Sequence, residues 1–322
     1  MRMIMQICRL EFTLHSIDKY ELAPFLGSTI RGAFGNILKD TFCIESHSHC
    51  PRCLQKNRCS YTFLFESGWY FATGDKPQSG APQPYVLEPQ FSNSNAAAEI
   101  KLGLLLFGNA IDYWPVFIYC IEKAGQRGLG KNRGSYTLQQ ARDVIGDRTL
   151  WSLGQDKYSD RPLTKSWDDY LKLGAELGDI RRCQIEMVTP LRMKRDGHLH
   201  NQMDFSTLIK GIMRRWALLN KYYGDGSKDD YTELINLASS VPSGTLNLHW
   251  QEMERYSRRQ DQRMMLGGLR GTMECEGNLS PFLPWLLVGE DIHVGKNTTF
   301  GLGKYVLKCE SDKGIKNVVD HQ

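Results

Sequence analysis

The sequence predicts an α+β protein made of two tandem copies of one βαββαβ unit. The chain has 322 residues, and at roughly 150 residues per domain this length indicates two domains with separate cores. Each half runs in the order strand, helix, strands, helix, strand, which is the ferredoxin-like order. The halves also align without a gap at an offset of 169 residues, which places Gly108 on Gly277 and Gly134 on Gly303. These observations predict two tandem ferredoxin-like domains.

The first half begins with a strand predicted over residues 4–14, because apolar and polar residues alternate there. An amphipathic helix is predicted over 21–39, with Pro24 in its first turn. Further strands are predicted at 61–65, 69–73, 85–88 and 99–107. An aromatic helix over 109–124 then leads into a glycine-rich segment, Gly125–Gly134, and a strand at 135–138.

The domain boundaries follow from this reading. The first domain is predicted at residues 1–140, with a cysteine-rich loop inserted at 43–59. Residues 141–182 are polar and show no sustained period, which is typical of a connecting segment, and the second domain is placed at 183–312. That domain is predicted to contain a helix capped by Asp204. Its other elements are strands at 182–194, 246–254 and 263–275, an apolar helix at 280–289 and a last strand ending in YVL.

The composition limits the class of protein. The 40 Lys and Arg exceed the 36 Asp and Glu by only four, so any affinity for nucleic acid must come from local clusters. The longest apolar runs, such as residues 102–108, fall well short of the ~20 residues that span a bilayer. The N-terminus does not have the pattern of a signal peptide. We therefore expect a cytoplasmic protein without a membrane partner, in a reducing compartment.

The nine cysteines are then expected to be metal ligands or free thiols. Cys43, Cys50, Cys53 and Cys59 form C-x6-C-x2-C-x5-C within a polar loop, a set that suits a structural, tetrahedral zinc site. His47 or His49 could replace one of these cysteines, and free thiols or an iron–sulfur cluster are the alternatives. The other five are expected to be small core residues, namely Cys8, Cys120, Cys183, Cys275 and Cys309.

Two glycine-rich segments are candidates for contact with a polyanion, because glycines let a backbone approach closely and flanking cations pair with phosphates. The predicted contacts are Lys131, Asn132 and Arg133 in the first segment and Lys296, Asn297 and Lys304 in the second. Arg214 and Arg215 on a second-half helix are further candidates. Ordinary helix-to-strand turns and a solvated helix face are the alternatives. Neither segment matches a nucleotide-binding P-loop.

Several motifs together resemble a known family: IRGAFG, C-x2-C-x5-CSYTFLFE, GLGKNRGSY, TPLRMK and PFLPWLLVGEDIHVGKNTTFGLGKY. They resemble the CRISPR precursor-RNA processing endoribonucleases of the RAMP superfamily over nearly the whole chain. The resemblance implies binding of CRISPR repeat RNA and one cut per repeat to make guide RNAs. It also implies other effector subunits as partners, while a non-catalytic guide-RNA-binding subunit is the alternative.

The reaction implied by this resemblance needs no metal cofactor. A ribose 2′-OH attacks the adjacent phosphate and leaves a 2′,3′-cyclic phosphate and a 5′-OH, with histidine as general base or acid. In the family the catalytic histidine commonly lies near or after the first helix of the first domain. On this chain the candidates are His15 before that helix and His47 and His49 after it. The last two also lie inside the predicted metal loop.

Overall fold

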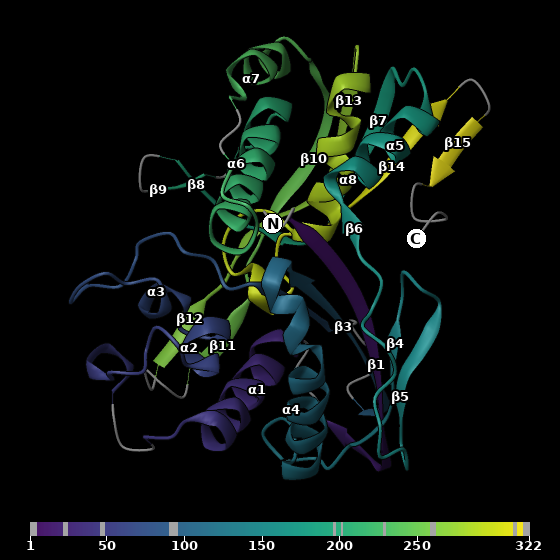
Figure 1. Cartoon of the computed structure of the whole chain (residues 1–322). Coiled ribbons are helices and arrows are strands. Elements are labelled where there is room, and N and C mark those ends of the chain that lie inside the picture. Colours follow the sequence, from purple (N-terminus) through teal and green to yellow (C-terminus); the bar gives the residue numbers. More distant parts are fainter. Residues whose placement is uncertain are drawn as a thin grey trace. The chain divides into compact units, whose positions relative to one another are not determined.

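A computed structural model describes residues 5–21, 25–45, 49–89, 96–195, 198–200, 202–227, 230–257, 262–311 and 314–317 (Figure 1). The chain divides into two compact units, one formed by residues 1–164 with 218–226 and the other by residues 165–217 with 227–322. Each unit combines helices with an antiparallel sheet, so the predicted α+β class is confirmed.

Unit 1 contains a sheet with the strand order β2-β3-β1-β4-β5, in which neighbours are antiparallel. The order β2-β3-β1-β4 is that of a ferredoxin-like βαββαβ unit, and β5 extends its edge. Its strands are β1 (Gln6–Glu21), β2 (Tyr85–Pro89), β3 (Ala96–Phe107), β4 (Thr137–Asp143) and β5 (Arg148–Ser152). Its helices are α1 (Gly27–Phe42), α2 (Ser60–Leu64), α3 (Ser67–Tyr70) and α4 (Trp114–Arg127), with short 3-10 turns at Cys50–Arg52 and Gly108–Tyr113.

The core of unit 1 follows from strand alternation. Leu10, Phe12 and Leu14 point to one side of β1 and are at most 1% exposed. Helices α1 and α4 pack against each other through Phe34 and Phe117, whose rings stack at 4.5 Å between centroids. This packing leaves the polar residues of β1, among them His15, to the opposite side of the strand.

Unit 2 repeats the arrangement with the strand order β10-β13-β7-β14-β15. The order β10-β13-β7-β14 is again ferredoxin-like, and its neighbours are antiparallel. The strands are β6 (Lys165–Ser166), β7 (Arg182–Leu191), β8 (Met193–Arg195), β9 (His198–His200), β10 (Ser243–Gln251), β11 (Glu254–Ser257), β12 (Gln262–Met265), β13 (Gly268–Glu276), β14 (Tyr305–Ser311) and β15 (Gly314–Asn317). The helices are α5 (Trp167–Leu177), α6 (Phe205–Tyr223), α7 (Thr232–Ser239) and α8 (Leu283–Ile292), with 3-10 turns at Ser280–Phe282 and Thr298–Phe300.

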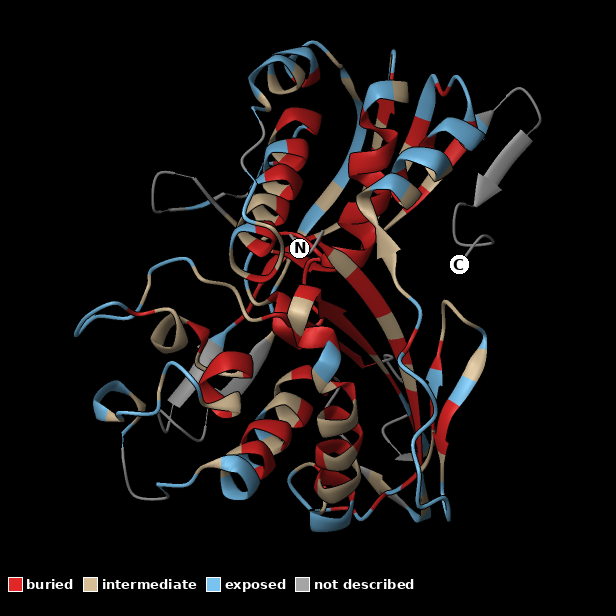
Figure 2. Cartoon of the chain, in the orientation of Figure 1, coloured by how far each residue is buried: buried red, intermediate tan, exposed pale blue. Residues whose placement is uncertain are grey.

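Helix α8 is the centre of the core of unit 2, because every one of its residues is buried (Figure 2). The apolar run that predicts this helix has no polar side for the same reason. Trp285 packs against Trp167 at 4.4 Å between ring centroids, and Gly174 of α5 lies against Pro284. The Asp204 cap of α6 is confirmed, since its carboxylate accepts the Thr207 N–H at 2.6 Å.

The internal repeat predicted from the sequence is visible in the element boundaries. Strands β3 and β13 end at Phe107 and Glu276, and helices α4 and α8 begin at Trp114 and Leu283. Both pairs of positions are 169 residues apart, and each helix follows a short 3-10 turn. The two units therefore share the path from the third strand to the second main helix.

Two short strands predicted in the first half are wrong. Residues 61–65 and 69–73 fall in and beside helices α2 and α3. Aromatic residues favour strands by propensity, but a five-residue stretch is too short to distinguish a period of two from one of 3.6. Packing decides the outcome, since Phe63 of α2 contacts the rings of Tyr70, Tyr113 and Tyr223 within unit 1.

The predicted boundary between the first strand and the first helix is also wrong. Strand β1 continues to Glu21, where Tyr20 and Glu21 pair with Ala97 and Ala96 of β3, and α1 begins only at Gly27. Pro24 lies outside the described residues. Pairing with a partner strand extends β1 through residues whose own sequence pattern predicts a helix.

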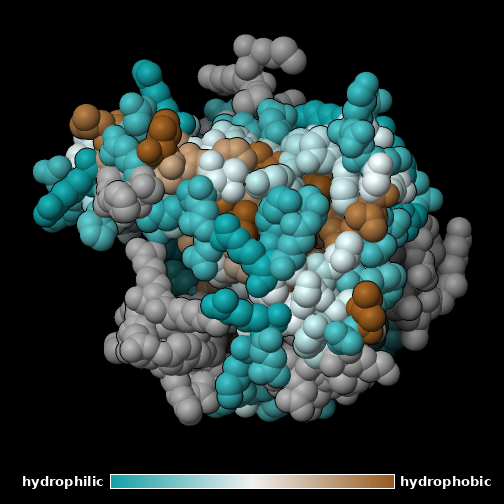
Figure 3. Space-filling model, turned by 90° about the horizontal axis from the view of Figure 1, so that it is seen from below, coloured by the Kyte–Doolittle hydropathy of each residue, from teal (hydrophilic) through white to brown (hydrophobic). Residues whose placement is uncertain are grey.

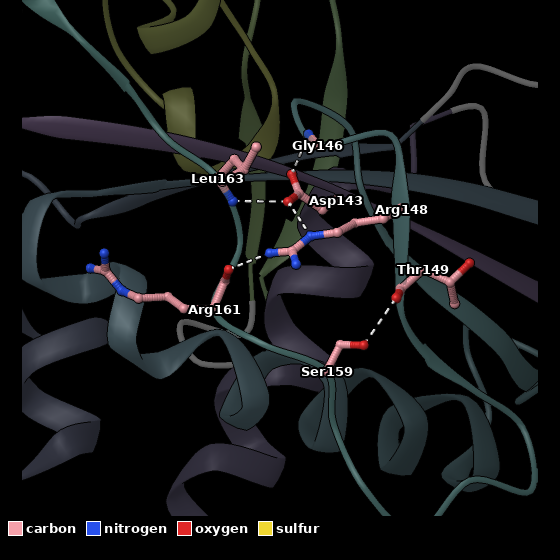
Figure 4. A network of polar contacts seen from close by, with 7 residues as sticks. All are labelled: Asp143, Gly146, Arg148, Thr149, Ser159, Arg161 and Leu163. Carbon is pink, nitrogen blue, oxygen red and sulfur yellow. Dashed lines mark hydrogen bonds and ion pairs between the residues drawn. The ribbon is translucent and has the colours of Figure 1, made fainter.

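Residues 141–164, part of the predicted connecting segment, are held to unit 1 by a buried carboxylate (Figure 4). Asp143 accepts hydrogen bonds from the Leu163 N–H at 2.8 Å and the Gly146 N–H at 3.1 Å, and pairs with Arg148 Nε at 3.3 Å. Arg148 also donates to the Arg161 carbonyl at 2.5 Å, and Ser159 donates to the Thr149 carbonyl at 3.3 Å. A single charged side chain thus organises the hairpin β4–β5 and the chain after it.

Candidate nucleic-acid interface

The glycine-rich segment of unit 1 forms a closed turn between α4 and β4. Helix α4 ends at Arg127, and Gly128 follows with φ +91°, a conformation that favours glycine. Leu129 and Gly134 exchange two backbone hydrogen bonds of 2.8 and 3.0 Å. The four residues between them therefore form the tip of this turn.

The tip carries the three residues predicted to contact RNA. Lys131, Asn132 and Arg133 are all exposed, and Arg133 has φ +50°. The glycines on either side serve close packing, because a Cβ at Gly134 would overlap the Tyr20 ring and one at Gly128 would overlap the Arg133 carbonyl. Two exposed cations on one turn are the arrangement that pairs with a phosphate backbone.

His15 lies beside this turn. In the register of the sheet His15 faces Thr137, the first residue of β4, and Ser16 Oγ donates to the Ser135 carbonyl at 2.5 Å. His15 also faces Glu99 of β3, and its Nε2 lies 2.8 Å from a Glu99 carboxylate oxygen. Both side chains of this pair are 49% exposed. The structure therefore brings one predicted catalytic residue next to the first predicted RNA-binding turn.

The chemistry of the His15–Glu99 pair follows from its hydrogen bond. An ionised carboxylate only accepts hydrogen bonds. The imidazole Nε2 therefore carries a hydrogen, and this N–H donates a hydrogen bond to Glu99. The other ring nitrogen, Nδ1, is then free to accept a proton. Such a pair is suited to general-base chemistry on a ligand that reaches the exposed ring.

The exposed side chains of the turn itself are polar. The C-terminal end of α4 points downward in Figure 1, and Figure 3 shows the molecule from that side. Among the side chains that Figure 3 colours, hydrophilic and intermediate ones predominate, and the hydrophobic ones form separate small patches. A polar surface of this kind is typical of nucleic-acid interfaces.

The glycine-rich segment of unit 2 is folded into its unit. Val294, Thr298, Thr299 and Phe300 are buried, while Lys296 is exposed and Asn297 and Lys304 are half-buried. The Lys296 N–H donates to the Arg192 carbonyl at 2.8 Å, and the Lys304 N–H donates to Thr189 Oγ1 at 2.9 Å. The backbone of this turn is thus fixed against β7 and the residue that follows it.

The residues that precede the turn of unit 2 include buried polar groups that are hydrogen-bonded. His293 is fully buried, has φ +59° and hydrogen-bonds through Nδ1 with the Leu302 carbonyl at 3.0 Å. Glu290 accepts the Leu307 N–H at 2.7 Å, and Asp291 accepts the Tyr170 hydroxyl at 2.6 Å. Burial, with Glu290 next in importance, holds the pKa of Tyr305 well above its usual value. Sequence reasoning missed this network, because the pairing partners are distant in the chain.

The two arginines of α6 are placed differently. Arg214 is exposed. Arg215 is half-buried, and its Nε donates to the Ile292 carbonyl at the C-terminus of α8 at 2.5 Å. Arg215 therefore ties α6 to α8, and a contact between either arginine and RNA stays a prediction.

The cysteine loop and its histidines are described in part. Cys43, Cys50, Cys53 and Cys59 are free and half-exposed, His49 is exposed, and His47 lies outside the described residues. Among the described side chains, no three His, Cys, Asp or Glu lie close enough together to hold a metal ion. The other five cysteines are buried, as predicted.

Two protein-family models match the chain, one in each half. Residues 185–305, from β7 to the start of β14, match the family model described as CRISPR-associated endoribonuclease Cas6. The chain carries a Cas6 family domain. Residues 5–163 match a second model, AF_1859_N, described as an N-terminal domain. The Cas6 match includes the whole second glycine-rich turn and helix α8.

Known proteins are similar to this chain over most of its length. An uncharacterised protein of Archaeoglobus fulgidus is 26% identical, over 94% of this chain and 98% of its own length. A Cas6 product complex matches with a TM-score of 0.56 and 13% identity, over 94% of this chain and 98% of that one. Cas6 of Thermus thermophilus matches with a TM-score of 0.55 and 14% identity, over 95% and 99%. These structural matches show a shared Cas6 fold. No helix in the described parts of the chain has the length and hydrophobicity to cross a bilayer.

Proposed function

We propose that this protein is an endoribonuclease that cuts CRISPR repeat RNA to release guide RNAs. The observation that carries the proposal is the Cas6 domain at residues 185–305, in a chain whose two units both have ferredoxin-like strand order. The exposed cations of the first glycine-rich turn support it, because they provide a place for the RNA backbone beside a histidine.

The proposed reaction is a transesterification without metal chemistry. The 2′-oxygen bonds to the adjacent phosphorus, the bond from phosphorus to the 5′-oxygen breaks, and the products are a 2′,3′-cyclic phosphate and a 5′-OH. A base takes the 2′-OH proton and an acid protonates the leaving 5′-oxygen. Lys131 and Arg133 lie a few residues before Thr137, which faces His15 in the sheet. Their positive charges would offset the negative charge that develops on the phosphate.

Of the three candidate histidines, His15 has the strongest structural support. Glu99 orients its ring, the free Nδ1 can act as base, and the first RNA-binding turn leads directly into its partner strand. His49 is exposed just before a 3-10 turn, and no side chain in the described parts of the chain orients its ring as Glu99 orients that of His15. In this proposal Glu99 is a positioning residue, which acts through His15.

The test uses repeat RNA from a CRISPR array next to the coding sequence, in EDTA. We expect cleavage with a 2′,3′-cyclic phosphate end, and no cleavage when the 2′-OH at the cut is replaced by hydrogen. His15→Ala should lower the cleavage rate about 10²- to 10⁴-fold with unchanged RNA affinity. Equal cleavage of the deoxy-substituted RNA would contradict the mechanism.

Controls separate the site from the fold. His249→Ala changes an exposed strand histidine in unit 2 and should keep the full rate. Glu99→Gln should lower the rate less than His15→Ala and should change its pH profile, because the orienting carboxylate is lost. If His15→Ala, His47→Ala and His49→Ala all keep the full rate, the catalytic assignment is wrong. Specific binding without any cleavage product would instead favour a guide-RNA-binding subunit.

The partners proposed for this chain are repeat RNA, the guide RNA it yields and other subunits of a CRISPR effector complex. One matching structure is a partial Cas6-RT-Cas1–Cas2 complex, with a TM-score of 0.57 and 13% identity. This chain covers 97% of its own length but 47% of that larger chain. Co-purification of the tagged protein with its guide RNA, followed by analysis of the bound proteins, tests these partners.

A further inference from the structure

Lys101 of β3 lies on the same side of the unit 1 sheet as the His15–Glu99 pair. Strands β1 and β3 pair in unbroken register here, with His15 opposite Glu99 and Thr13 opposite Lys101. Directly opposite residues of antiparallel strands share one side of the sheet, as the 2.8 Å hydrogen bond between His15 and Glu99 shows. Side chains two positions apart on one strand also share a side, so Lys101 is a neighbour of both members of the pair.

The Lys101 ammonium can reach a ligand that is bound at His15. Diagonal neighbours on two antiparallel strands have Cα atoms about 7–8 Å apart, a distance that a long side chain can bridge. Lys101 is exposed, while Thr13 opposite it has a short side chain and is 7% exposed. Lys101 is therefore the long, exposed side chain of this strand pair next to His15.

Lys101 differs from two other cations on this side of the sheet. The strand register also places Arg9 of β1 and Arg142 of β4 there. Arg9 pairs with Glu88 at 2.9 Å, and Arg142 pairs with Asp147, so both guanidinium charges are offset within the unit. Among the residues that the structure describes, no carboxylate pairs with Lys101. Its charge is therefore available to an anionic ligand.

The strand on the other side of β1 is irregular at the same level. Between the partners of Thr13 and Leu14, β4 has one extra residue, Gln139, which forms a β-bulge. Thr13 thus faces Lys101 on one side and the bulge on the other, and His15 follows two residues later. Bulges are frequent beside active sites, because the extra residue bends the strand and redirects side chains. The break in the ladder is consistent with a site at this point of the sheet.

We propose that Lys101 is a catalytic residue whose ammonium donates a hydrogen bond to a non-bridging oxygen of the phosphate at the cut. This inference rests on the proposed function. His15 Nδ1 takes the 2′-OH proton as the 2′-oxygen bonds to phosphorus, and negative charge then grows on the non-bridging oxygens. Lys101 offsets that charge and keeps its own proton throughout, so the group that protonates the leaving 5′-oxygen is a different one.

The cations of the first glycine-rich turn have a different task in this proposal. Lys131 and Arg133 lie on the turn that leads into β4, whereas Lys101 lies on the sheet beside the candidate base. A cation that holds the RNA backbone acts before and during the reaction alike, which changes the affinity for RNA. A cation at the reacting phosphate acts mainly in the transition state, which changes the rate. Separate measurements of binding and rate therefore distinguish the two.

The test compares single-turnover cleavage of repeat RNA with binding of the uncleavable deoxy-substituted RNA. Lys101→Gln should lower the cleavage rate about 10²-fold. Its binding should weaken by no more than about threefold, since one exposed contact is lost. Lys101→Arg keeps the charge and should stay within about tenfold of the full rate. Lys172→Gln changes an exposed lysine of α5 in unit 2 and should keep both rate and binding.

Sulfur substitution at the cut tests for direct contact with the phosphate. The two diastereomers, each with sulfur in place of one non-bridging oxygen, are separated and cleaved by both proteins. For the oxygen that Lys101 contacts, sulfur should slow the unaltered chain about tenfold more than it slows Lys101→Gln, because the variant has already lost the hydrogen bond. The other diastereomer should be slowed equally in both proteins.

Two results overturn the inference while leaving the proposed function intact. One is a full cleavage rate in Lys101→Gln, and the other is an equal effect of sulfur in both proteins for both diastereomers. An unaltered chain that binds repeat RNA without cutting it contradicts the proposed function and this inference together. The rate of the unaltered chain therefore distinguishes the two kinds of failure.

Discussion

The two glycine-rich turns lie at the same place in the repeated unit, between the second main helix and the last ferredoxin strand, yet they differ in exposure. The tip in unit 1 exposes Lys131, Asn132 and Arg133. In unit 2 the turn is mostly buried, and Lys296 is its exposed cation among the predicted RNA contacts. The repeated glycines therefore indicate positions at which the backbone is crowded, and such positions occur in both turns. Contact with a ligand depends in addition on which side chains reach the surface.

The largest expected effect separates two glycines that the repeat aligns, Gly134 and Gly303. Gly303 has φ +75°, and a Cβ there would overlap the Val294 backbone carbonyl. Gly303→Ala should lower the free energy of unfolding by about 3 kcal/mol, because the backbone cannot move aside. Gly134 has no positive φ, and a Cβ there would overlap the root of the Tyr20 side chain and no backbone atom, so Gly134→Ala should cost less, about 2 kcal/mol. Urea unfolding monitored by tryptophan fluorescence measures both.

Equal destabilisation by these two variants would contradict the distinction between the turns. Gly154→Ala is the control for φ alone, since Gly154 has φ +87° and open space around a Cβ. It should cost about 1 kcal/mol, from the left-handed conformation only.

The sequence predicts the repeat and the strand order well because both depend on local patterns. The 169-residue offset locates the start of α4 and α8, since the same Gly, Asn and Pro residues open both helices. It cannot predict which turn is buried, because that depends on residues from other elements. Tyr20 covers Gly134 from β1, and Arg192 and Thr189 bind the second turn from β7 and the residue after it.

The candidate site was predictable as a set of residue types but not as an arrangement. The exposed cations of the first turn stand out in the sequence. The pairing of His15 with Glu99 depends on strand register, which a single sequence does not specify at the end of a long strand. Helices α2 and α3 were missed for a related reason, since their aromatic residues pack against Tyr113 and Tyr223, which come from distant parts of the chain.

The next largest effect concerns RNA affinity. The double variant Lys131→Gln/Arg133→Asn removes both charges of the first tip, and Asn tolerates the positive φ at position 133. RNA binding should weaken about tenfold at moderate salt, and the slope of log K against log salt should fall by about 1.4. Lys296→Gln removes one charge and should lower the slope by about 0.7. Fluorescence anisotropy at four salt concentrations measures both slopes.

The opposite ranking, with Lys296→Gln having the larger effect, would show that RNA relies on the buried turn more than on the exposed tip. Asn132→Ala serves as the uncharged control at the tip and should leave the salt slope unchanged. All these variants should keep their unfolding midpoint, because the changed side chains are exposed.

The smallest expected effect extends the comparison to two adjacent arginines of α6. Arg215 binds the last carbonyl of α8, so Arg215→Gln should destabilise unit 2 by about 1 kcal/mol and leave the salt slope unchanged. Arg214 is exposed, so Arg214→Gln should keep the stability and lower the slope by about 0.7 if the residue meets a phosphate. The same chemical change at neighbouring positions thus distinguishes a structural cation from an RNA-binding one. A reduced slope in Arg215→Gln with unchanged stability would reverse the assignment and place RNA against the buried side of α6.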